Sequence, residues 1–446
     1  MHITSKIIED GISISVHDKN YSLKYPLNAW KSYPDVMKDF LNDNFSYLKI
    51  LPTAIMFNET EVTLNTSSPL FQFTFYQMML NHLPYSADYD NINISSLIKK
   101  FMNTRFNFKD YNVKFPQYQE ELNEKAIINF TFGKESLLTY AVSHEIGLPS
   151  TLVYVEEPDV PLEINYRKQA KERFYREFKV DVTTLYNETA LLRNPEHFNL
   201  KKSAIGDGQI ITEYCLAMMP LTHYYRSKYI LFGNENSCNQ SYISKEGFIA
   251  HPVFDQTHRW MIELNNIAQQ MTNHQAQVVS LVESLYELAI LKILHSRYTE
   301  IGKYQMSCFP DDNEYGKNNY WCHHCSKCAR VFILLLANNI DPKRVGFTEN
   351  MLGKDFKDYF SLFSGSKNMT GWDKNCGRDE QLYSFYLAYK NGAKGYLIDK
   401  FKEQFLKDVT SREDEFFKKF FSIYDTITIP KKIKSKVTSI YKEELN

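Results

Sequence analysis

The sequence has little net charge, no long uncharged apolar run and few cysteines. Its 52 Lys and Arg residues nearly cancel its 53 Asp and Glu residues, and this balance argues against a large nucleic-acid-binding surface. The first ten residues lack the apolar core of a signal peptide, and no later run approaches the length of a membrane span. We therefore expect neither a membrane nor a nucleic acid as a partner. With 446 residues and no internal repeat, the chain is long enough for about two or three globular domains.

The seven cysteines are unevenly distributed along the chain. Four of them, Cys308, Cys322, Cys325 and Cys328, lie in one short stretch, and the last three have the spacing C-x-x-C-x-x-C. An odd count with most thiols clustered does not fit a secreted disulfide framework, so we expect a cytoplasmic protein. Four thiolates form a closed tetrahedral shell, and the spacing therefore predicts a structural Zn²⁺ site. An iron-sulfur cluster is the alternative metal group, and reduced thiols without a ligand are the alternative without a metal.

Two histidines and two further cysteines are weaker candidates. His323 and His324 lie between the cysteines, but four thiolates already complete a zinc shell, so we expect both histidines to be exposed spacers. Cys376 stands alone in a polar stretch where a catalytic nucleophile could lie, and Cys238 adjoins an apolar strand-like segment. Because single cysteines are more often structural, we favour that role for Cys376 and leave Cys238 open.

The first region, residues 1–110, has the pattern of a small α+β extension. Apolar and polar residues alternate at 11–16 and 61–64, as they do in strands, and a helical run follows at 75–83. Residues 107–124 are polar with scattered aromatic residues, which favours a linker that lies on the surface.

The last region, residues 346–446, is predicted to be helical. Its run 400–419 is rich in Lys and Glu, which is typical of the solvated face of helices. We expect the phenylalanines in and beside this run to face inward, namely Phe401, Phe405, Phe416, Phe417 and Phe420.

The central region, residues 126–345, alternates apolar strand-like runs with amphipathic segments. The first strand, 126–132, is β-prone and ends at a turn that contains a glycine, and the segment 134–147 has apolar residues at helical spacing. Further strands are predicted at 150–155, 180–185 and 229–232, and further helices at 163–178 and 210–225. Strands that alternate with helices predict an α/β fold with a doubly wound parallel sheet, whose ligand lies beyond the carboxyl ends of the strands.

The turn after the first strand reads Thr131-Phe132-Gly133-Lys134-Glu135-Ser136. It combines hydroxyls, a glycine and a lysine at the point where a strand passes to a helix. Unpaired N–H groups of the first helical turn and the helix dipole favour an anion at such a place. A phosphate-binding loop is therefore one interpretation, and an ordinary turn with one glycine is the other.

Residues 131–136 resemble the Ser-Gly-Gly-Lys-Asp-Ser loop of the PP-loop ATP pyrophosphatases. Within that superfamily, a late cysteine followed by C-x-x-C-x-x-C is similar to the zinc site of 7-cyano-7-deazaguanine synthase, an enzyme of queuosine biosynthesis. Residues 230–237 resemble the strand-end segment that lines the pocket of those enzymes, which implies that Gly233 and Asn234 contact the nucleotide. The resemblance covers residues 126–345 and implies a Rossmann-like PP-loop domain with a zinc-bound C-terminal segment. Enlarged relatives of this kind occur in bacterial antiphage defence systems.

The resemblance implies that the chain activates a carboxylate with ATP and Mg²⁺. ATP is split between its α- and β-phosphates, the carboxylate takes AMP, and an amine attacks the acyl-adenylate. The implied catalytic residues are Lys134, Glu135 and Ser136. The implied nucleotide contacts in the loop are Thr131, Phe132, Gly133, Lys134 and Ser136. In the family the carboxylate belongs to 7-carboxy-7-deazaguanine and the amine is ammonia, which gives an amide and then a nitrile. The added regions suggest a partner protein as a different acyl acceptor.

Two residues depart from the family loop. Phe132 replaces its first glycine, so a bulky side chain is expected where the backbone approaches phosphate, and the turn needs a different φ. Glu135 replaces aspartate, which keeps the charge and lengthens the side chain. Because Gly133, Lys134 and Ser136 are retained, we still expect ATP binding.

Two alternatives remain from the sequence. The departures in the loop raise the first, a non-catalytic nucleotide-binding relative. The second is a tRNA-thiolating enzyme of the same superfamily, which uses cysteines or an iron-sulfur cluster to deliver sulfur. The balanced charge and the cysteine spacing argue against the second.

Two polar loops precede predicted helices. Asp207 and Gln209 lie where relatives contact nucleotide or substrate, although a helix N-cap explains Asp207 equally well. Residues 255–257 occupy a similar position, and pocket lining and capping are equally good interpretations there.

Overall fold

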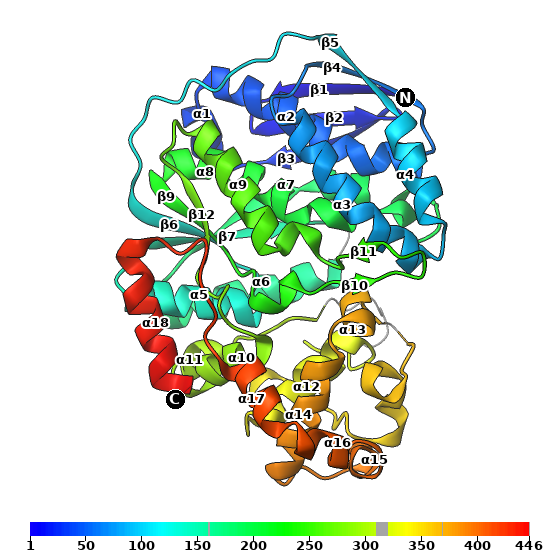
Figure 1. The fold of residues 1–446 in the computed structure, drawn as a ribbon. Helices are drawn as coiled ribbons and strands as arrows, with labels where there is room; N and C mark the ends of the chain where they lie inside the picture. Colours follow the sequence, from blue (N-terminus) through cyan, green and yellow to red (C-terminus); the bar gives the residue numbers. More distant parts are fainter. Residues whose placement is uncertain (159–160, 309–319, 368, 446) are drawn as a thin grey trace.

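One ten-stranded sheet runs through the N-terminal and central parts of the chain, with helices on both faces (Figure 1). This computed structural model describes residues 1–158, 161–308, 320–367 and 369–445. From one edge to the other, the strands are β12 (Gln277–Ser280), β9 (Ser227–Phe232), β6 (Asn123–Asn129), β7 (Ser150–Glu156), β8 (Val182–Asn187), β3 (Lys19–Lys24), β2 (Gly11–Val16), β1 (His2–Ile8), β4 (Glu61–Ser67) and β5 (Arg105–Asp110). Most neighbouring strands are parallel, and the antiparallel pairs are β8 with β3, β3 with β2 and β2 with β1. The predicted α/β class is therefore confirmed.

The five parallel strands of the central region are not arranged in chain order. The chain passes from β6 to β7 and β8 on one side, and then returns to β9 and β12 on the other side of β6. The direction of winding therefore reverses between β6 and β9. In open parallel sheets, the carboxyl ends of the strands leave a crevice at such a reversal. Residues 131–136 follow β6 and lie at this point.

Alternating side chains of the central strands enter two separate cores. In β6, Ile127 packs in the core on one face, and Ile128 packs in the core on the other. Helices that contribute to the first core are α1 (Leu27–Ser32), α2 (Asp35–Met56), α3 (Gln72–Asp90), α4 (Ile94–Asn103), α7 (Ile210–Ala217), α8 (Met219–Tyr224) and α9 (His258–Met271). The second core includes α5 (Lys134–Glu145), α6 (Pro161–Phe178), α10 (Glu287–Ser296), α11 (Thr299–Gly302) and α18 (Lys431–Leu445). Because both faces are covered, the strands are apolar on both sides.

The helices of a third core lie below the sheet layer in Figure 1, and this core is built from helices and the loops between them, without a strand. Its helices are α12 (Ser326–Ala337), α14 (Arg378–Lys390), α15 (Tyr396–Gln404), α16 (Leu406–Ser411) and α17 (Glu413–Phe421), with the short α13 (Gly371–Asn375) beside them. Helix α10 contributes to both the second and the third core, through Leu294 and Leu291 respectively. After α17 the chain returns to the sheet layer, where α18 packs against α10. No helix within the described ranges is long and apolar enough to span a bilayer.

The elements predicted for the central region are confirmed with shifts of a few residues at their ends. The segment 210–225 is an exception, because it divides into α7 and α8. Pro220 lies in the first turn of α8, where the lack of a backbone N–H is tolerated. In the middle of a continuous helix, the same residue would remove a backbone hydrogen bond. The linker is confirmed for residues 111–122, and it runs over the outside of the molecule between β5 and β6 (Figure 1).

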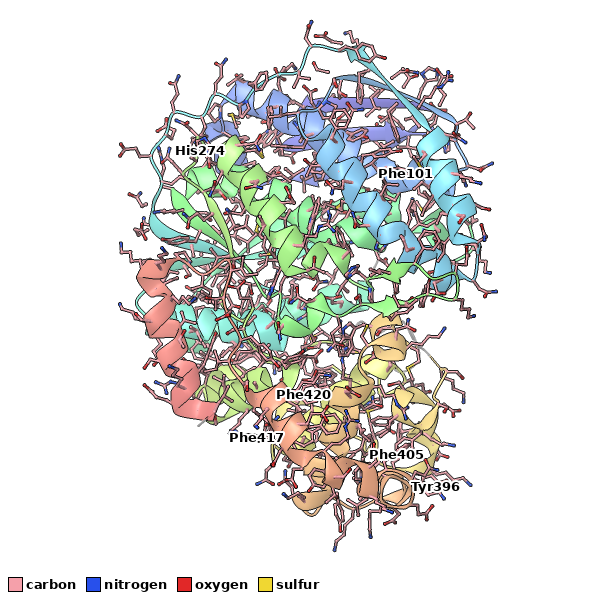
Figure 2. All side chains as sticks on the ribbon, viewed as in Figure 1. Phe101, His274, Tyr396, Phe405, Phe417 and Phe420 are labelled. Atoms are coloured by element: carbon pink, nitrogen blue, oxygen red, sulfur yellow. The ribbon has the colours of Figure 1, made fainter. Side chains whose placement is uncertain are left out.

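One phenylalanine of the C-terminal region is oriented differently from the prediction. Phe401, Phe416 and Phe420 are buried in the third core, as expected, and Phe405 is partly buried beside it. Phe417 is 50% exposed on α17 (Figure 2). Phe416 and Phe420 are four residues apart and share the inner face of α17, so their neighbour Phe417 falls outside that stripe.

The N-terminal region joins the central sheet through β3, where Leu23 pairs with Asn187 of β8. A buried ion pair strengthens this junction. Lys49 of α2 and Glu213 of α7 are both 0% exposed and lie 2.6 Å apart, Nζ to Oε2. Glu213 also accepts a hydrogen bond from Asn187, at 2.6 Å. Burial lowers the pKa of Lys49 to about 8, although Glu213 opposes this shift.

We expect the Lys49→Met substitution to lower the free energy of unfolding by about 3 kcal/mol, because it leaves a buried carboxylate without its nearest cation. Urea denaturation measures the change. The matched control is Lys31→Met, whose exposed ammonium pairs with exposed Glu9 at 3.6 Å and should contribute less than about 1 kcal/mol. Equal effects of the two substitutions would contradict this role for Lys49.

Candidate functional site

A cavity of about 1120 Å³ opens at the carboxyl ends of the central strands. Asn129 at the end of β6, Glu157 after β7 and Phe232 at the end of β9 all line it. Tyr89 of α3 contributes from the N-terminal region, and Trp372 of α13 contributes from the C-terminal region. The cavity therefore lies at the winding reversal, and all three parts of the chain form its wall.

Phe132 occupies the cavity loop without entering the cavity. Its backbone is left-handed, with φ of 58°, a conformation that glycine adopts far more easily. Its fully buried ring packs against Phe130 and Phe174 in the second core. The expectation that this side chain lies where phosphate would approach is therefore wrong, because the positive φ turns the ring into the core.

The other loop residues face the cavity, and their hydroxyls organise the turn. Thr131, Gly133, Lys134, Glu135 and Ser136 all line it. The Ser136 hydroxyl accepts from the Thr131 N–H at 3.2 Å and donates to the Gly133 carbonyl at 3.0 Å. Gly133 is the N-cap of α5 and has no side chain to cap the first turn. The N–H groups of that turn are thus available to an anion in the cavity.

Lys134 is the best-connected charge in the loop. Its ammonium contacts the carboxylate of neighbouring Glu135 and lies 3.0 Å from Oε2 of Glu287, the first residue of α10. Burial alone would lower the pKa of Lys134, but the two carboxylates outweigh burial and raise it. Lys134 is therefore a fixed cation at the cavity wall, in contrast to the mobile charge expected from its position.

A second, partly buried cation continues this network. Arg330 of α12 lies 3.5 Å from Glu287 and 3.3 Å from Asp373 of α13. Its guanidinium also stacks over Trp372, 4.5 Å from the ring centroid. Lys134, Glu287 and Arg330 thus form an alternating chain of charges along one wall of the cavity, and Asp373, which does not line the cavity, extends this chain.

The segment after β9 packs directly on the loop. An added Cβ on Gly233 would lie 2.6 Å from the Glu135 Cβ, so only glycine allows this approach. Asn234 also lines the cavity, and its amide donates to the Met261 sulfur at 2.8 Å. Glu235 accepts from the Ser237 N–H at 2.6 Å, and burial together with the charge of Glu287 raises its pKa above the usual range of carboxyl groups.

More charged side chains line the rest of the cavity in nearly balanced numbers. The cations besides Lys134 and Arg330 are Arg167, Arg193, Lys202 and Lys327. The acids besides Glu135, Glu235 and Glu287 are Glu157, Glu163, Glu196 and Asp207. Several are paired, such as Arg167 with Glu163 at 3.0 Å and Arg193 with Glu157 at 2.5 Å. The lining therefore offers both cations for phosphate and carboxylates for a divalent metal ion.

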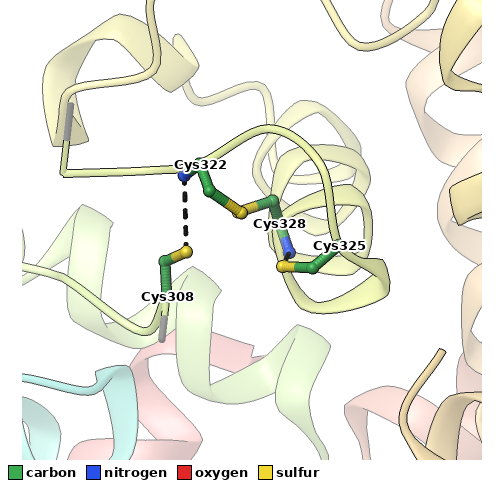
Figure 3. A group of neighbouring side chains, drawn as sticks. All are labelled: Cys308, Cys322, Cys325 and Cys328. Carbon is green, nitrogen blue, oxygen red and sulfur yellow. Dashed lines mark hydrogen bonds between the residues drawn. The ribbon is translucent and has the colours of Figure 1, made fainter. Parts of the chain in front are cut away.

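The four predicted cysteine ligands come together (Figure 3), and their chain neighbours Ser307 and Lys327 line the cavity. Cys308 approaches from a separate segment, whereas Cys322 lies before α12 and Cys325 and Cys328 lie at its start. All four sulfurs lie within 4.8 Å of one another. Backbone N–H groups point at them, from Cys322 to the Cys308 sulfur at 3.3 Å and from Cys328 to the Cys325 sulfur at 3.4 Å.

This sulfur cluster fits a soft metal ion such as zinc. Zinc–sulfur bonds of about 2.3 Å place the corners of a tetrahedron about 3.8 Å apart, and the Cys322 and Cys328 sulfurs are 3.7 Å apart. The N–H groups directed at sulfur stabilise thiolate ligands. Among the described residues, these four cysteines lie close enough together to hold a metal ion.

Neither histidine beside the cysteines belongs to the sulfur cluster, but the expectation that both are exposed is wrong. His323 is fully buried, and its Nε2 accepts from the Thr348 N–H at 3.2 Å. His324 is partly buried and its Nδ1 lies 2.7 Å from the Cys322 carbonyl oxygen. Both rings therefore brace the cysteine loop.

The two remaining candidate cysteines occupy different environments. Cys238 lines the cavity, and its sulfur lies 3.5 Å from Oε1 of Glu235 and 3.6 Å from Oε1 of Gln256, which are the two acceptors within reach of its single S–H. Cys376 is partly buried and does not line the cavity. Burial raises the pKa of the Cys376 thiol to about 11, which keeps it protonated and fits the structural role predicted for it.

The two polar loops separate into cavity residues and helix caps. Asp207 lines the cavity and provides no side-chain cap, whereas Gln209 is fully buried. Asp255 accepts from the Ile211 N–H at 2.9 Å and so stabilises the start of α7. Gln256 lines the cavity, and Thr257 caps α9.

Sequence reasoning missed Glu287, Arg167, Arg193, Lys327 and Arg330 as cavity residues. Of these five, only Lys327 and Arg330 lie near a motif that the sequence reveals. Lys327 lies inside the C-x-x-C spacing of Cys325 and Cys328, and Arg330 lies two residues after Cys328. A scan against protein-family models gives no match, and a search of curated proteins gives none either. Conclusions about function therefore depend on the site itself.

We expect the purified protein to contain one zinc ion per chain, held by the sulfur cluster. Elemental analysis measures the content, and Co²⁺ replacement should give the intense absorption of tetrahedral thiolate coordination. The Cys325→Ser variant should lose the metal, whereas Cys376→Ser should retain it. Iron with a brown colour, or no metal in the wild-type protein, would contradict this assignment.

We expect Gly233→Ala to lower the free energy of unfolding by about 1 to 3 kcal/mol, because the new methyl group overlaps Glu135 and forces the loop to move. The matched control is Gly353→Ala, where the nearest atom would be 3.6 Å away. Thermal and urea denaturation compare the two variants. A Gly233→Ala variant as stable as the control would show that the loop does not require this close approach.

Proposed function

We propose that this chain is an ATP-dependent enzyme of the PP-loop type that activates a carboxylate as an acyl-adenylate and passes the acyl group to an amine. The proposed substrate is 7-carboxy-7-deazaguanine or a similar deazapurine. ATP and Mg²⁺ are the proposed co-substrate and activating ion, and Zn²⁺ is the proposed metal of the sulfur cluster. Action in antiphage defence, with a partner protein as amine donor, belongs to the same proposal.

The observation that carries this proposal is the geometry of the loop. An uncapped helix N-terminus, a fixed lysine and two hydroxyls meet at the winding reversal of a parallel sheet, which is where such sheets bind nucleotides. Phe132 and Glu135 are the two departures that raised the alternative of a non-catalytic relative. The ring of Phe132 lies in the core and leaves the cavity free, so Phe132 no longer supports that alternative.

The charge of the cavity supports a nucleotide that carries a metal ion. A bare triphosphate would meet many carboxylates, including Glu135, Glu235 and Glu287. These carboxylates would hold a divalent ion, which would offset part of the phosphate charge, while Lys134 and Arg330 neutralise the remaining charge. At about 1120 Å³, the cavity is larger than the roughly 300–1,000 Å³ typical of small-molecule pockets, which supports two ligands bound side by side.

The proposed chemistry consists of two steps, adenylation of the carboxylate and transfer of the acyl group to an amine. A carboxylate oxygen attacks the α-phosphorus, the bond from that phosphorus to the bridging oxygen breaks, and pyrophosphate leaves. An amine nitrogen then attacks the acyl carbon, the bond from that carbon to the AMP oxygen breaks, and AMP leaves. Mg²⁺ supplies Lewis acidity at the phosphates when it is bound.

The residues of the loop have distinct roles in this proposal. Lys134 and the first-turn N–H groups of α5 hold the pyrophosphate moiety and stabilise the charge that develops on it. Ser136 and Thr131 keep the turn in shape through their mutual hydrogen bonds. Glu235 has a raised pKa, which suits it to accept the proton that the amine releases.

We expect the zinc-loaded protein to form AMP and pyrophosphate when it is incubated with ATP, Mg²⁺ and 7-carboxy-7-deazaguanine. Mass spectrometry of the products, with ammonia or with candidate partner proteins, identifies the acyl acceptor. Lys134→Met should lower the rate of AMP formation by about 100-fold or more, because it removes a charge that stabilises the transition state.

The matched control is Lys303→Met. Lys303 also pairs with two glutamates, Glu177 at 2.7 Å and Glu300 at 2.8 Å, but it lies on the surface away from the cavity. This variant should keep the wild-type rate. No AMP under any condition, or equal rates for Lys134→Met and Lys303→Met, would contradict the proposal.

A further inference from the structure

The sulfur cluster and the loop 131–136 are connected by two separate routes. The first is a backbone route. Met306 lies two residues before Cys308, and its N–H donates to the Phe132 carbonyl at 2.8 Å. The Met306 carbonyl in turn accepts from Arg167 at 3.0 Å. Any movement of Cys308 is therefore transmitted to the residue that sets the left-handed turn of the loop.

The second route consists of side chains and starts at α12. Cys325 is the N-cap of this helix, and its sulfur accepts from the Cys328 N–H at 3.4 Å. Arg330 lies two residues after Cys328 and contacts Glu287 at 3.5 Å, and Glu287 contacts Lys134 at 3.0 Å. The side chains of Glu287 and Lys134 are each 4% exposed and that of Arg330 is 14% exposed, so solvent screens these ion pairs only weakly.

The first turn of α12 is also fixed from the C-terminal region. Asp373 accepts from the Ser326 hydroxyl at 2.7 Å and lies 3.3 Å from Arg330. The Thr370 N–H donates to the same Ser326 hydroxyl at 3.0 Å. Ser326 lies directly after Cys325, so the position of Cys325 determines the position of this turn. The position of the turn then determines where Arg330 contacts Glu287.

We propose that metal binding at the sulfur cluster and anion binding at the loop are energetically coupled, and that Arg330 is the positioning residue through which most of the coupling passes. A bound ion would link Cys308 to the start of α12. This link would hold both the backbone route through Met306 and the side-chain route through Arg330 in place. Loss of the ion frees Cys308 from α12, so Glu287 loses the fixed position of its partner Arg330 and Lys134 in turn loses the fixed position of Glu287. This inference rests on the proposed function in one respect, because it takes the anion to be a nucleotide.

Coupling between two binding sites is reciprocal. If the metal raises the affinity for nucleotide by some factor, the nucleotide must raise the affinity for metal by the same factor. Coupling factors of about 5 to 150 are typical, and we expect about tenfold or more for the wild-type protein. In Arg330→Met we expect a factor of about fivefold or less, because only the hydrogen bond from Met306 to Phe132 remains.

The experiment measures both sides of this cycle. Calorimetry with Mg²⁺ and α,β-methylene-ATP, an analogue that cannot be cleaved at that bond, gives the nucleotide affinity of zinc-loaded protein and of protein stripped with a zinc-selective chelator. Competition for zinc against the same chelator, with and without the analogue, gives the metal affinity. Circular dichroism verifies that each form is folded.

Two further variants accompany the wild type and Arg330→Met. Arg330→Lys retains a cation and should keep part of the coupling, which separates loss of charge from misfolding. Arg412→Met removes an exposed arginine of the C-terminal region that pairs with Glu415, and it should keep the full factor. If the metal acted only by keeping the chain folded, the coupling factor would be the same in Arg330→Met as in the wild type.

The possible failures are distinguishable. Absence of nucleotide binding to the zinc-loaded wild-type protein would overturn the proposed function together with this inference. Nucleotide binding of equal affinity with and without zinc would overturn the inference alone. A wild-type coupling factor that survives in Arg330→Met would overturn the role of Arg330. A factor that falls in this variant and survives in Arg412→Met supports the inference.

Discussion

The site depends on the buried chain of ion pairs from Lys134 through Glu287 and Arg330 to Asp373. Each of these charges would be strongly destabilising without a partner, so the four residues hold one another in place. They come from the loop after β6 and from the starts of α10, α12 and α13, which are distant in sequence. These ion pairs therefore fix the positions of the carboxyl ends of the strands, the four clustered cysteines and the C-terminal helices relative to one another.

The two outer regions of the chain are built into the cavity. Pairing of β3 with β8 continues the central sheet into the N-terminal region, and Tyr89 carries that region to the cavity wall. Trp372 does the same for the C-terminal region while it stacks on Arg330. A ligand that filled the cavity would contact all three parts of the chain.

The local features of the site were predictable from sequence, and its long-range features were not. The strand, turn and helix around residues 131–136 follow from apolar periodicity and one glycine, and the sulfur cluster follows from cysteine spacing. Glu287 gave no signal, because an acidic residue at a helix start looks like an ordinary favourable charge near the helix dipole. Lys49 gave no signal either, because lysines are rarely buried in folded proteins, whereas this one lies buried against Glu213. The side chain of Phe132 was expected where phosphate approaches the loop. This was wrong because a sequence gives the size of a side chain but does not give the sign of its φ angle.

A crystal structure of the zinc-loaded protein with Mg²⁺ and α,β-methylene-ATP would locate the nucleotide directly. We expect the phosphates to lie against the first-turn N–H groups of α5 and the Lys134 ammonium, with Arg330 and Glu287 still in contact. We also expect a metal ion among the four sulfurs of Figure 3. Nucleotide bound elsewhere, or a loop without phosphate at saturating analogue, would show that the loop is not the nucleotide site.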